Sequence, residues 1–474
     1  MKHYFIYIAT LLMVITACDA IDQVESTFLH EKESIEGFRI PHSINPLSQE
    51  EAVMVARQFA SMNGVRTKTN DSKNIGSVYA IDGKPGTPAM YAVNYGENDG
   101  FVIINTSKKY FPILAYSETG HYAQDRNASG LDVWLDEQRV LIEAAETLPL
   151  DSLKEVTKSW RNYEKNTFPT ITTKSGGDTL SFRNAAIAEW ELEGYECMDL
   201  ETSSMYLNPY IYNLWCDLAE EQSDPSYDYM ASSVVLYYGT TSNAQIGPYL
   251  STTWGQNAPY NQGIDPSYPP AGSSIAAMAQ IMRYHEWPTI YNWSTMSDTT
   301  ATYYTKILYK NLRRDSETTY NNTLNISETD IYDLKDAITG YQYHYHYNAT
   351  VATHSLTVAK SNVNNGKPVF MEGKTTTGIK HAWVCDGRKT YTTANHLILM
   401  VYTPDERYMQ AENGGYYSDS NSTEYLHMNW GEDGSGNGWF SGDNSSFSGY
   451  LNNVWTQYNY STNRKDIINI SPDN

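Results

Sequence analysis

The sequence predicts an α+β protein built in two parts, and three observations lead to this prediction. Between residues 48 and 148, a helical pattern is followed by four strand-like segments and a second helical pattern. From residue 246 onward, helical segments come first and strand-like segments follow. The chain has 474 residues, enough for two or three domains that each bury a core. Because the helices and the sheet of the second part are segregated, we expect a cleft where they meet.

The first 18 residues are expected to be a targeting segment and not part of the fold. Lys2 precedes the apolar run YFIYIATLLMVITA, which is short for a membrane span. The run ends in ITAC, which resembles the cleavage box of bacterial lipoproteins and makes Cys18 the expected lipid attachment site. The protein would then be exported and anchored by acyl chains at the bacterial outer membrane or cell surface. A plain signal peptide with an incidental cysteine is the alternative.

The sequence of residues 47–148 predicts a domain made of helices and an antiparallel sheet. Residues 19–46 before it are polar and form the expected linker. A helix begins after Ser48, which can form a capping box with Glu51, and its apolar spacing continues to Gly64. The strand-like runs SVYAID, AMYAVNYG, GFVIINTS and FPILAYSETG follow, and a second helix is predicted over residues 131–148. Residues 149–245 are predicted to be a connector and a transition region rich in Tyr and Trp.

The sequence of residues 246–474 predicts the second domain, in which helices are followed by strands. A strongly marked helix covers residues 272–287, with Ile275, Met278 and Met282 on one face and Pro288 after its end. A polar helical stretch is predicted over about 300–340. The predicted strands are KPVFMEG, HAWVCDG, LILMVYT, EYLHMNW and GWFSG.

Charge and cysteine content exclude several classes of function. The net charge of −22 argues against a nucleic-acid partner, because neutralising phosphates requires a basic face. Besides Cys18 the chain has Cys197, Cys216 and Cys385, so at most one disulfide can form, with Cys197–Cys216 as one candidate pair. The cysteine spacings do not resemble a zinc site, and no metal or cofactor is expected.

Four segments of the second domain carry side chains that could share one cleft. They contain Gln256, then Ser273 at a helix start, then His381, and finally Asn429 with Trp430. A nucleophile at a helix N-terminus feels the positive end of the macrodipole, and a neighbouring imidazole can exchange its proton. An Asn side chain can orient that ring, and a Gln side chain can donate to an oxyanion.

Each segment also has an ordinary explanation when it is taken alone. Ser273 or Ser274 could be a helix cap, which is the commonest use of serine at that place. His381 could be a core or surface histidine, and NWGEDGSGNGW could be a glycine-rich hairpin.

Taken together and in order, the segments resemble the streptopain family of papain-like cysteine peptidases, found in streptococci and Bacteroidetes. The matching text is TTWGQNAPYN, AMAQIMRYHEWP, NGKPVFMEG, HAWVCDG and HMNWGEDGSGNGWF. EEAVMVARQFA, the strand run through GFVIINTSKKYFPILAYSETG and the helix at VWLDEQ resemble the inhibitory prodomain of such zymogens. The resemblance implies a papain-like domain with a helical and a sheet half, a prodomain held against it, and a protein or peptide as substrate or ligand.

The resemblance also assigns roles to individual residues. It implies that His381 is the general base or imidazolium, Gln256 the oxyanion donor, and Asn429 the ring-orienting residue, with Trp430 beside it. The sequence departs from the family at the nucleophile position, where Ser273 stands in place of Cys. It departs again after NWG, where Glu432 and Asp433 replace the usual Trp and Gly and put two acids near the rim of the cleft.

A serine at this position is expected to react slowly or not at all. It has no accessible alkoxide and depends on a neutral histidine that accepts its proton during attack. Asn429 supplies no charge to stabilise the resulting imidazolium, and in serine proteases an Asp-to-Asn change costs about 10⁴ in rate. The shorter hydroxyl also lies farther from the carbonyl, and about 1 Å of misplacement can cost about 10². Asp386 or Asp433 could support a Ser–His pair, although neither occupies the family's orienting position.

Two functions therefore remain open. The chain is either a lipid-anchored homologue of streptopain-type cysteine endopeptidases with reduced or absent activity, or a non-catalytic cell-surface protein that binds peptides or proteases. An engineered Cys-to-Ser exchange is a third explanation, against which the intact signal segment and the absence of a tag argue. Without self-cleavage, residues 47–145 should stay attached unless another protease removes them.

Overall fold

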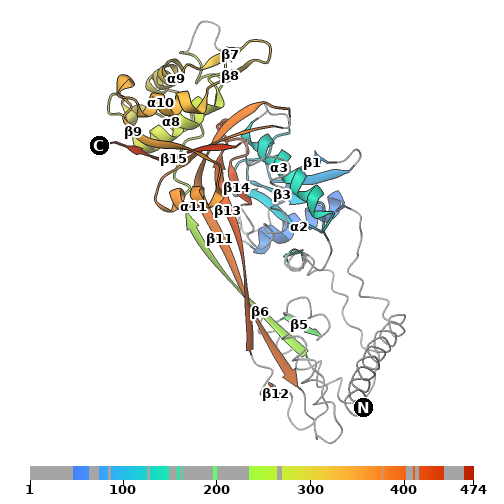
Figure 1. Ribbon diagram of the computed structural model, residues 1–474. Coiled ribbons are helices and arrows are strands. Elements are labelled where there is room, and N and C mark those ends of the chain that lie inside the picture. Colours follow the sequence, from blue (N-terminus) through green and yellow to red (C-terminus); the bar gives the residue numbers. More distant parts are fainter. Residues whose placement is uncertain are drawn as a thin grey trace, which may run out of the picture. The chain divides into compact units, whose positions relative to one another are not determined.

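The computed structural model describes most of both predicted domains (Figure 1). The described residues are 46–62, 74–83, 87–124, 129–148, 156, 159–160, 163, 196–199, 234–263, 269–375, 377–401, 409–410, 416–441 and 464–473. They all belong to one compact unit. The predicted signal segment with Cys18, the linker up to residue 45 and Cys216 lie outside the described residues. No helix in the described part is long and apolar enough to cross a membrane.

The first domain is a helix followed by a four-stranded meander and a second helix. Helix α2 (Gln49–Met62) begins with the predicted capping box, in which the backbone N–H groups of Ser48 and Glu51 each donate to the other's side chain. Strands β1 (Ile75–Asp82), β2 (Pro88–Tyr95), β3 (Phe101–Asn105) and β4 (Ile113–Ser117) pair antiparallel in sequence order. Helix α3 (Gly130–Ala145) starts with a second capping box, made by Ser129 and Asp132.

The helical half of the second domain surrounds a buried helix. Helix α8 (Ser273–His285) confirms the helix predicted over 272–287, and every residue from Ser273 to Met282 is buried. Helices α9 (Tyr303–Asp315) and α10 (Ile331–Thr339) lie within the predicted polar helical stretch. Their apolar faces share one core cluster with α8 and with Phe370, Ala382 and Val384 of the sheet half. A small hairpin, β7 (Thr319–Asn321) and β8 (Ile326–Glu328), lies between α9 and α10 in sequence.

The sheet half is one continuous antiparallel sheet with the first domain. In it, β4 is followed by β14 (Gly438–Ser441), β13 (Tyr416–Asn429), β11 (Lys380–Val401), β10 (Val369–Lys374), β15 (Lys465–Pro472) and β9 (Tyr347–Thr353). Strands β4 and β14 join the domains, with Tyr116 opposite Trp439 and Ala115 opposite Phe440. Helix α11 (Leu356–Asn364) packs on β11, β10 and β15. The predicted α+β class is thus confirmed.

One strand prediction is wrong. HAWVCDG and LILMVYT were expected to be two strands, but HAWVCDG and the LILMV part of the second segment both belong to β11, which runs unbroken beside β13 and β6 (Val234–Ile246) (Figure 1). Ladder pairing on both sides of β11 satisfies the backbone of the polar stretch KTYTTANH that lies between the two predicted strands. Two short strands, β5 (Glu196–Asp199) and β12 (Met409–Gln410), pair with β6 and β11. Most of β6 lies inside the predicted transition region, so that region contributes to the peptidase sheet.

Candidate active site

Ser273 is the first residue of α8, and its side chain contacts the strand that carries His381. The Ser273 Oγ accepts a hydrogen bond of 3.1 Å from the backbone N–H of Ala382. Strand β13 ends at Asn429 opposite Val384, so β11 has no strand neighbour on that side at Ala382, and the helix start takes this place. The N-cap residue is Gly272, with a φ of 101° and no side-chain capping bond. Neither Ser273 nor Ser274 is therefore the helix cap, and the ordinary explanation for this serine pair is wrong.

His381 is buried and neutral. It lies opposite Gly373 of β10, and 6% of its surface is exposed. Burial lowers the pKa of His381 to about 4, although the nearby carboxylate of Asp132 acts in the opposite direction. Its Nε2 has no hydrogen-bond partner, and within the described residues no hydrogen bond joins it to Ser273. The structure thus brings Ser273 next to the backbone beside His381 without pairing the two side chains.

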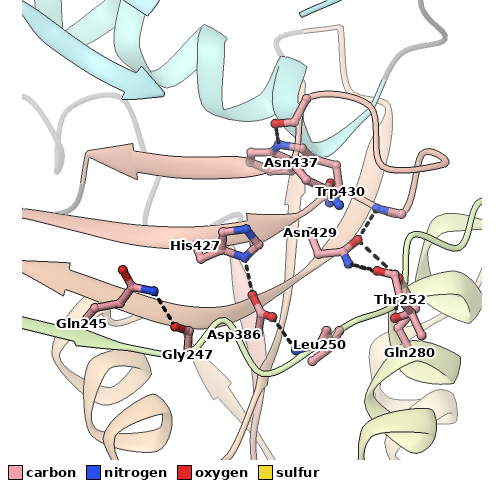
Figure 2. A network of polar contacts seen from close by, with 12 residues as sticks. Gln245, Gly247, Leu250, Thr252, Gln280, Asp386, His427, Asn429, Trp430 and Asn437 are labelled. Atoms are coloured by element: carbon pink, nitrogen blue, oxygen red, sulfur yellow. Dashed lines mark hydrogen bonds and ion pairs between the residues drawn. The ribbon is translucent and has the colours of Figure 1, made fainter. Parts of the chain in front are cut away.

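The Asn429 side chain connects three segments of the second domain (Figure 2). Its Nδ2 donates to the carbonyl of Thr252 at 2.7 Å and to Oε1 of Gln280 at 3.1 Å. Its Oδ1 accepts from Nε2 of Gln280 and from the backbone N–H of Gly431, both at 3.2 Å. These bonds fill the amide's hydrogen-bonding capacity, so in this arrangement Asn429 joins strand β13, helix α8 and the Thr252 loop. Its predicted role in orienting His381 stays a prediction.

The predicted oxyanion donor is engaged by an acid of the same chain. The Nε2 of Gln256 donates to the carboxylate of Glu432, one of the two residues that depart from the family pattern. The second, Asp433, lies against the backbone of Gly255, where an added Cβ would come 2.5 Å from its Oδ1. Burial raises the pKa of the Asp433 carboxyl. The two acids expected at the rim therefore reach the Gln256 loop itself.

Trp430 is held beside this network by its own loop. Its Nε1 donates to the carbonyl of Gly436 and its backbone N–H donates to Asn437 Oδ1, both at 2.9 Å. Its ring lies 5.4 Å from that of Trp383 and 4.9 Å from that of Phe440. With 1% of its surface exposed, Trp430 excludes water from the end of β13.

Asp386, considered above as a partner for a Ser–His pair, forms hydrogen bonds with other residues. Its carboxylate is fully buried and accepts from the backbone N–H of Leu250 at 2.8 Å. Its other oxygen lies 2.6 Å from Nδ1 of His427 (Figure 2). The carboxylate whose charge acts on His381 is instead Asp132 of the first domain, which favours the protonated ring and so opposes the lowering of the pKa by burial.

Comparison with known proteins identifies both domains. Residues 44–141 match the family model described as "Spi protease inhibitor", and residues 254–440 match that of the "Peptidase C10 family". Residues 254–440 thus form a domain of the peptidase C10 family, the family of streptopain. Its C10 domain contains all five predicted site residues, and its Spi-type domain is the predicted prodomain.

Solved structures with similarity to this chain come from the same family. A fragment of prointerpain A from Prevotella intermedia is 16% identical with a TM-score of 0.42, covering 82% of this chain and 97% of the fragment. The active interpain A cysteine protease of the same organism is 18% identical with a TM-score of 0.32, covering 52% of this chain and 96% of that chain. No curated protein matches the chain.

The Spi-type prodomain packs its helix α3 against the C10 domain beside His381. Gly130 lies so close to Trp383 and Trp430 that a Cβ on it would come within 2.6 and 2.8 Å of their rings. One turn later, Val133 fills the space above Gly373. The prodomain is thus held against its own peptidase domain, as the resemblance implied.

Sequence patterns did not single out three of the residues that shape this site. Gln280 is fully buried in the apolar face of α8, and a glutamine within AMAQIM is the one available signal for it. Trp383 and Arg464 meet α3 across a domain boundary, and no local pattern marks them. Within the described residues, the arrangement combines a hydroxyl at a helix start, a buried imidazole whose Nε2 has no hydrogen-bond partner, and an oxyanion donor bound to a carboxylate.

Proposed function

We propose that this chain is an exported, lipid-anchored member of the peptidase C10 family in which Ser273 occupies the nucleophile position and peptide hydrolysis is weak or absent. The observation that carries the proposal is the place of Ser273, at the start of α8 and bonded to the residue after His381. Family membership supports a streptopain-type peptidase fold around it.

The surroundings of the hydroxyl support weak turnover. A serine nucleophile needs a base that removes its proton, and within the described residues no hydrogen bond joins the Ser273 hydroxyl to His381. An imidazole whose pKa burial lowers to about 4 is a weak proton acceptor. Asn429 offers no negative charge, and Asp386 is paired with His427.

A second candidate function is a non-catalytic protein that binds peptides or a protease through the same fold. The bond from Gln256 to Glu432 favours it, because a carboxylate at the oxyanion donor both occupies that donor and repels a developing negative charge. The two candidates differ in turnover alone, so kinetics separates them.

The paired experiment compares the native chain with Ser273→Cys. Both proteins are tested for casein digestion and for covalent labelling by a thiol-directed epoxide, before and after limited trypsin treatment. Labelling of the Cys form at residue 273 supports this position as the nucleophile's place. Digestion by the native chain at a rate comparable to that of Ser273→Cys, lost in Ser273→Ala, would make it an active serine enzyme and overturn the proposal.

A further inference from the structure

The guanidinium of Arg464 is buried between the prodomain and the peptidase sheet. Its side chain is 6% exposed, and its Nη1 lies 3.0 and 2.9 Å from the two carboxylate oxygens of Glu137 on α3, whose side chain is 4% exposed. The guanidinium carbon lies 5.2 Å from the centre of the Trp383 ring, which holds the side chain in place. The cation thus lies directly before strand β15 of the second domain, and its anion belongs to the prodomain.

This pairing leaves most of the guanidinium unused. Both oxygens of Glu137 share one nitrogen, Nη1. Among the described residues, Nη2 has only the weak acceptor Sδ of Met371, at 3.9 Å, and the buried Nε has no hydrogen-bond partner. An arginine pairs most strongly with a carboxylate through two nitrogens in a fork. Arg464 therefore has room for a better-placed carboxylate than the one the prodomain supplies.

Arg464 lies in the same row of the sheet as His381. Glu372 of β10 pairs with Lys465 of β15, so the preceding residue Arg464 lies beside Gly373, and Gly373 is opposite His381 on β11. Two strand spacings separate Arg464 from His381, which is about 10 Å. Gly373 between them has no side chain, and the prodomain's Val133 fills the space above it.

The charge balance of Arg464 depends on the prodomain. The neighbouring carboxylate of Asp466 is bound by Nδ1 of His354 at 3.0 and 2.9 Å. Glu137 is therefore the one carboxylate bonded to Arg464 within the described residues. When α3 leaves, a largely desolvated cation loses its partner, which favours binding of another anion.

We propose that Arg464 is a carboxylate-binding subsite of the peptide cleft, filled by Glu137 in the prodomain-bound form and by an acidic side chain of a peptide ligand when α3 leaves. At about 3.3 Å per residue, an extended peptide places this side chain about three residues from the one next to His381. The proposal rests on the proposed function in taking the ligand of the cleft to be a peptide.

The test uses the full chain with Glu137→Gln, which removes the charge that pairs α3 with Arg464 and so favours the form in which α3 has left the cleft. Fluorescein-labelled peptides carry one Glu moved along an otherwise neutral sequence, and each has a twin with Gln. In anisotropy titrations, one Glu position should bind Glu137→Gln about tenfold more tightly than its Gln twin, because a charged pair forms. The native chain should bind that Glu peptide about tenfold more weakly, because Glu137 competes from within the chain.

Two variants show whether the effect belongs to Arg464. Glu118→Gln is the matched control, because it removes another prodomain carboxylate, 3.0 Å from Lys389 of the C10 domain, and leaves Arg464 paired. It should not create the Glu preference. Arg464→Lys in the Glu137→Gln chain keeps the charge but loses the fork, and it should reduce the preference several-fold.

Three results would overturn the proposal: Glu and Gln peptides that bind equally at every position, a preference that Arg464→Lys leaves unchanged, or no peptide binding by Glu137→Gln. These titrations measure binding and not cleavage. If Ser273 proved to be an efficient nucleophile, the proposed function would be refuted. The peptide titrations could still be carried out with chains that carry Ser273→Ala, and they would test the Arg464 subsite independently.

Discussion

The bond between Gln256 and Glu432 predicts that restoring a cysteine nucleophile alone will not restore full activity. The relevant variants are Ser273→Cys and Ser273→Cys with Glu432→Trp, the residue usual in the family at that place. In the single variant the oxyanion donor remains bound to a carboxylate. In the double variant the Gln256 amide is released.

The expected loss in rate follows from the strength of the hydrogen bond between Gln256 and Glu432, which keeps the Gln256 amide from the oxyanion. A hydrogen bond to a charged group contributes about 1.5–3 kcal/mol, so an oxyanion that displaces the carboxylate loses about ten- to hundredfold in rate. If the carboxylate is not displaced, the loss is that of a missing oxyanion donor, about 10²–10³. We therefore expect kcat/KM of the double variant to exceed that of Ser273→Cys by at least about tenfold.

The assay is hydrolysis of a fluorogenic peptide after limited trypsin treatment of the full chain, with active sites counted by epoxide labelling. Gln256→Ala added to the double variant is the control, and it should return kcat/KM to the level of Ser273→Cys. Equal activity of the single and double variants would refute the inference that Glu432 blocks the oxyanion donor.

Three further predictions concern stability and anchoring. The pKa of His381 is lowered from 6.5 to about 4, so between these two pH values the folded state binds fewer protons than the unfolded chain. The contribution of His381 to the free energy of unfolding is therefore fully present above about pH 6.5. It falls by about 3 kcal/mol as the pH drops from 6.5 through 4. Urea unfolding at pH 7 and pH 4 should show a smaller loss for His381→Gln than for the native chain, and an equal loss would contradict this. Asn429→Ala leaves buried groups of Thr252 and Gln280 unpaired and should lower the free energy of unfolding by about 3 kcal/mol, whereas a loss below 1 kcal/mol would show that the network is not stabilising. Cys18→Ser should abolish incorporation of labelled palmitate and move the protein from the detergent to the aqueous phase, and an unchanged distribution would exclude the lipid anchor.

Much of the fold could be read from the sequence because local chemistry marks it. The capping box of Ser48 and Glu51, the apolar face of α8 and the Pro after it are short-range signals, and the structure contains the expected elements. The length of β11 could not be read, because its continuity depends on pairing with β13 and β6, both distant in sequence. Strand pairing across a domain boundary, as between β4 and β14, likewise has no local signal.

The candidate site also has features that the sequence could predict and features that depend on contacts between distant segments. Its residue types and order carried the family resemblance, and the structure places Ser273 beside the strand of His381. The partners of those residues were not predictable. Gln256 and Glu432 are 176 positions apart, and Glu137 and Arg464 are 327 apart, so their contacts follow from packing that no single segment encodes.

Self-processing of the purified native chain is the most direct test of weak or absent turnover at Ser273. Intact-mass spectrometry would follow the native chain and Ser273→Ala at high concentration over several days. We predict that residues 47–145 stay attached in both proteins, and that any slow background loss of this segment occurs at the same rate in both. Rapid and complete release of this segment by the native chain, and not by Ser273→Ala, would show that the hydroxyl cleaves peptide bonds efficiently and would contradict the account.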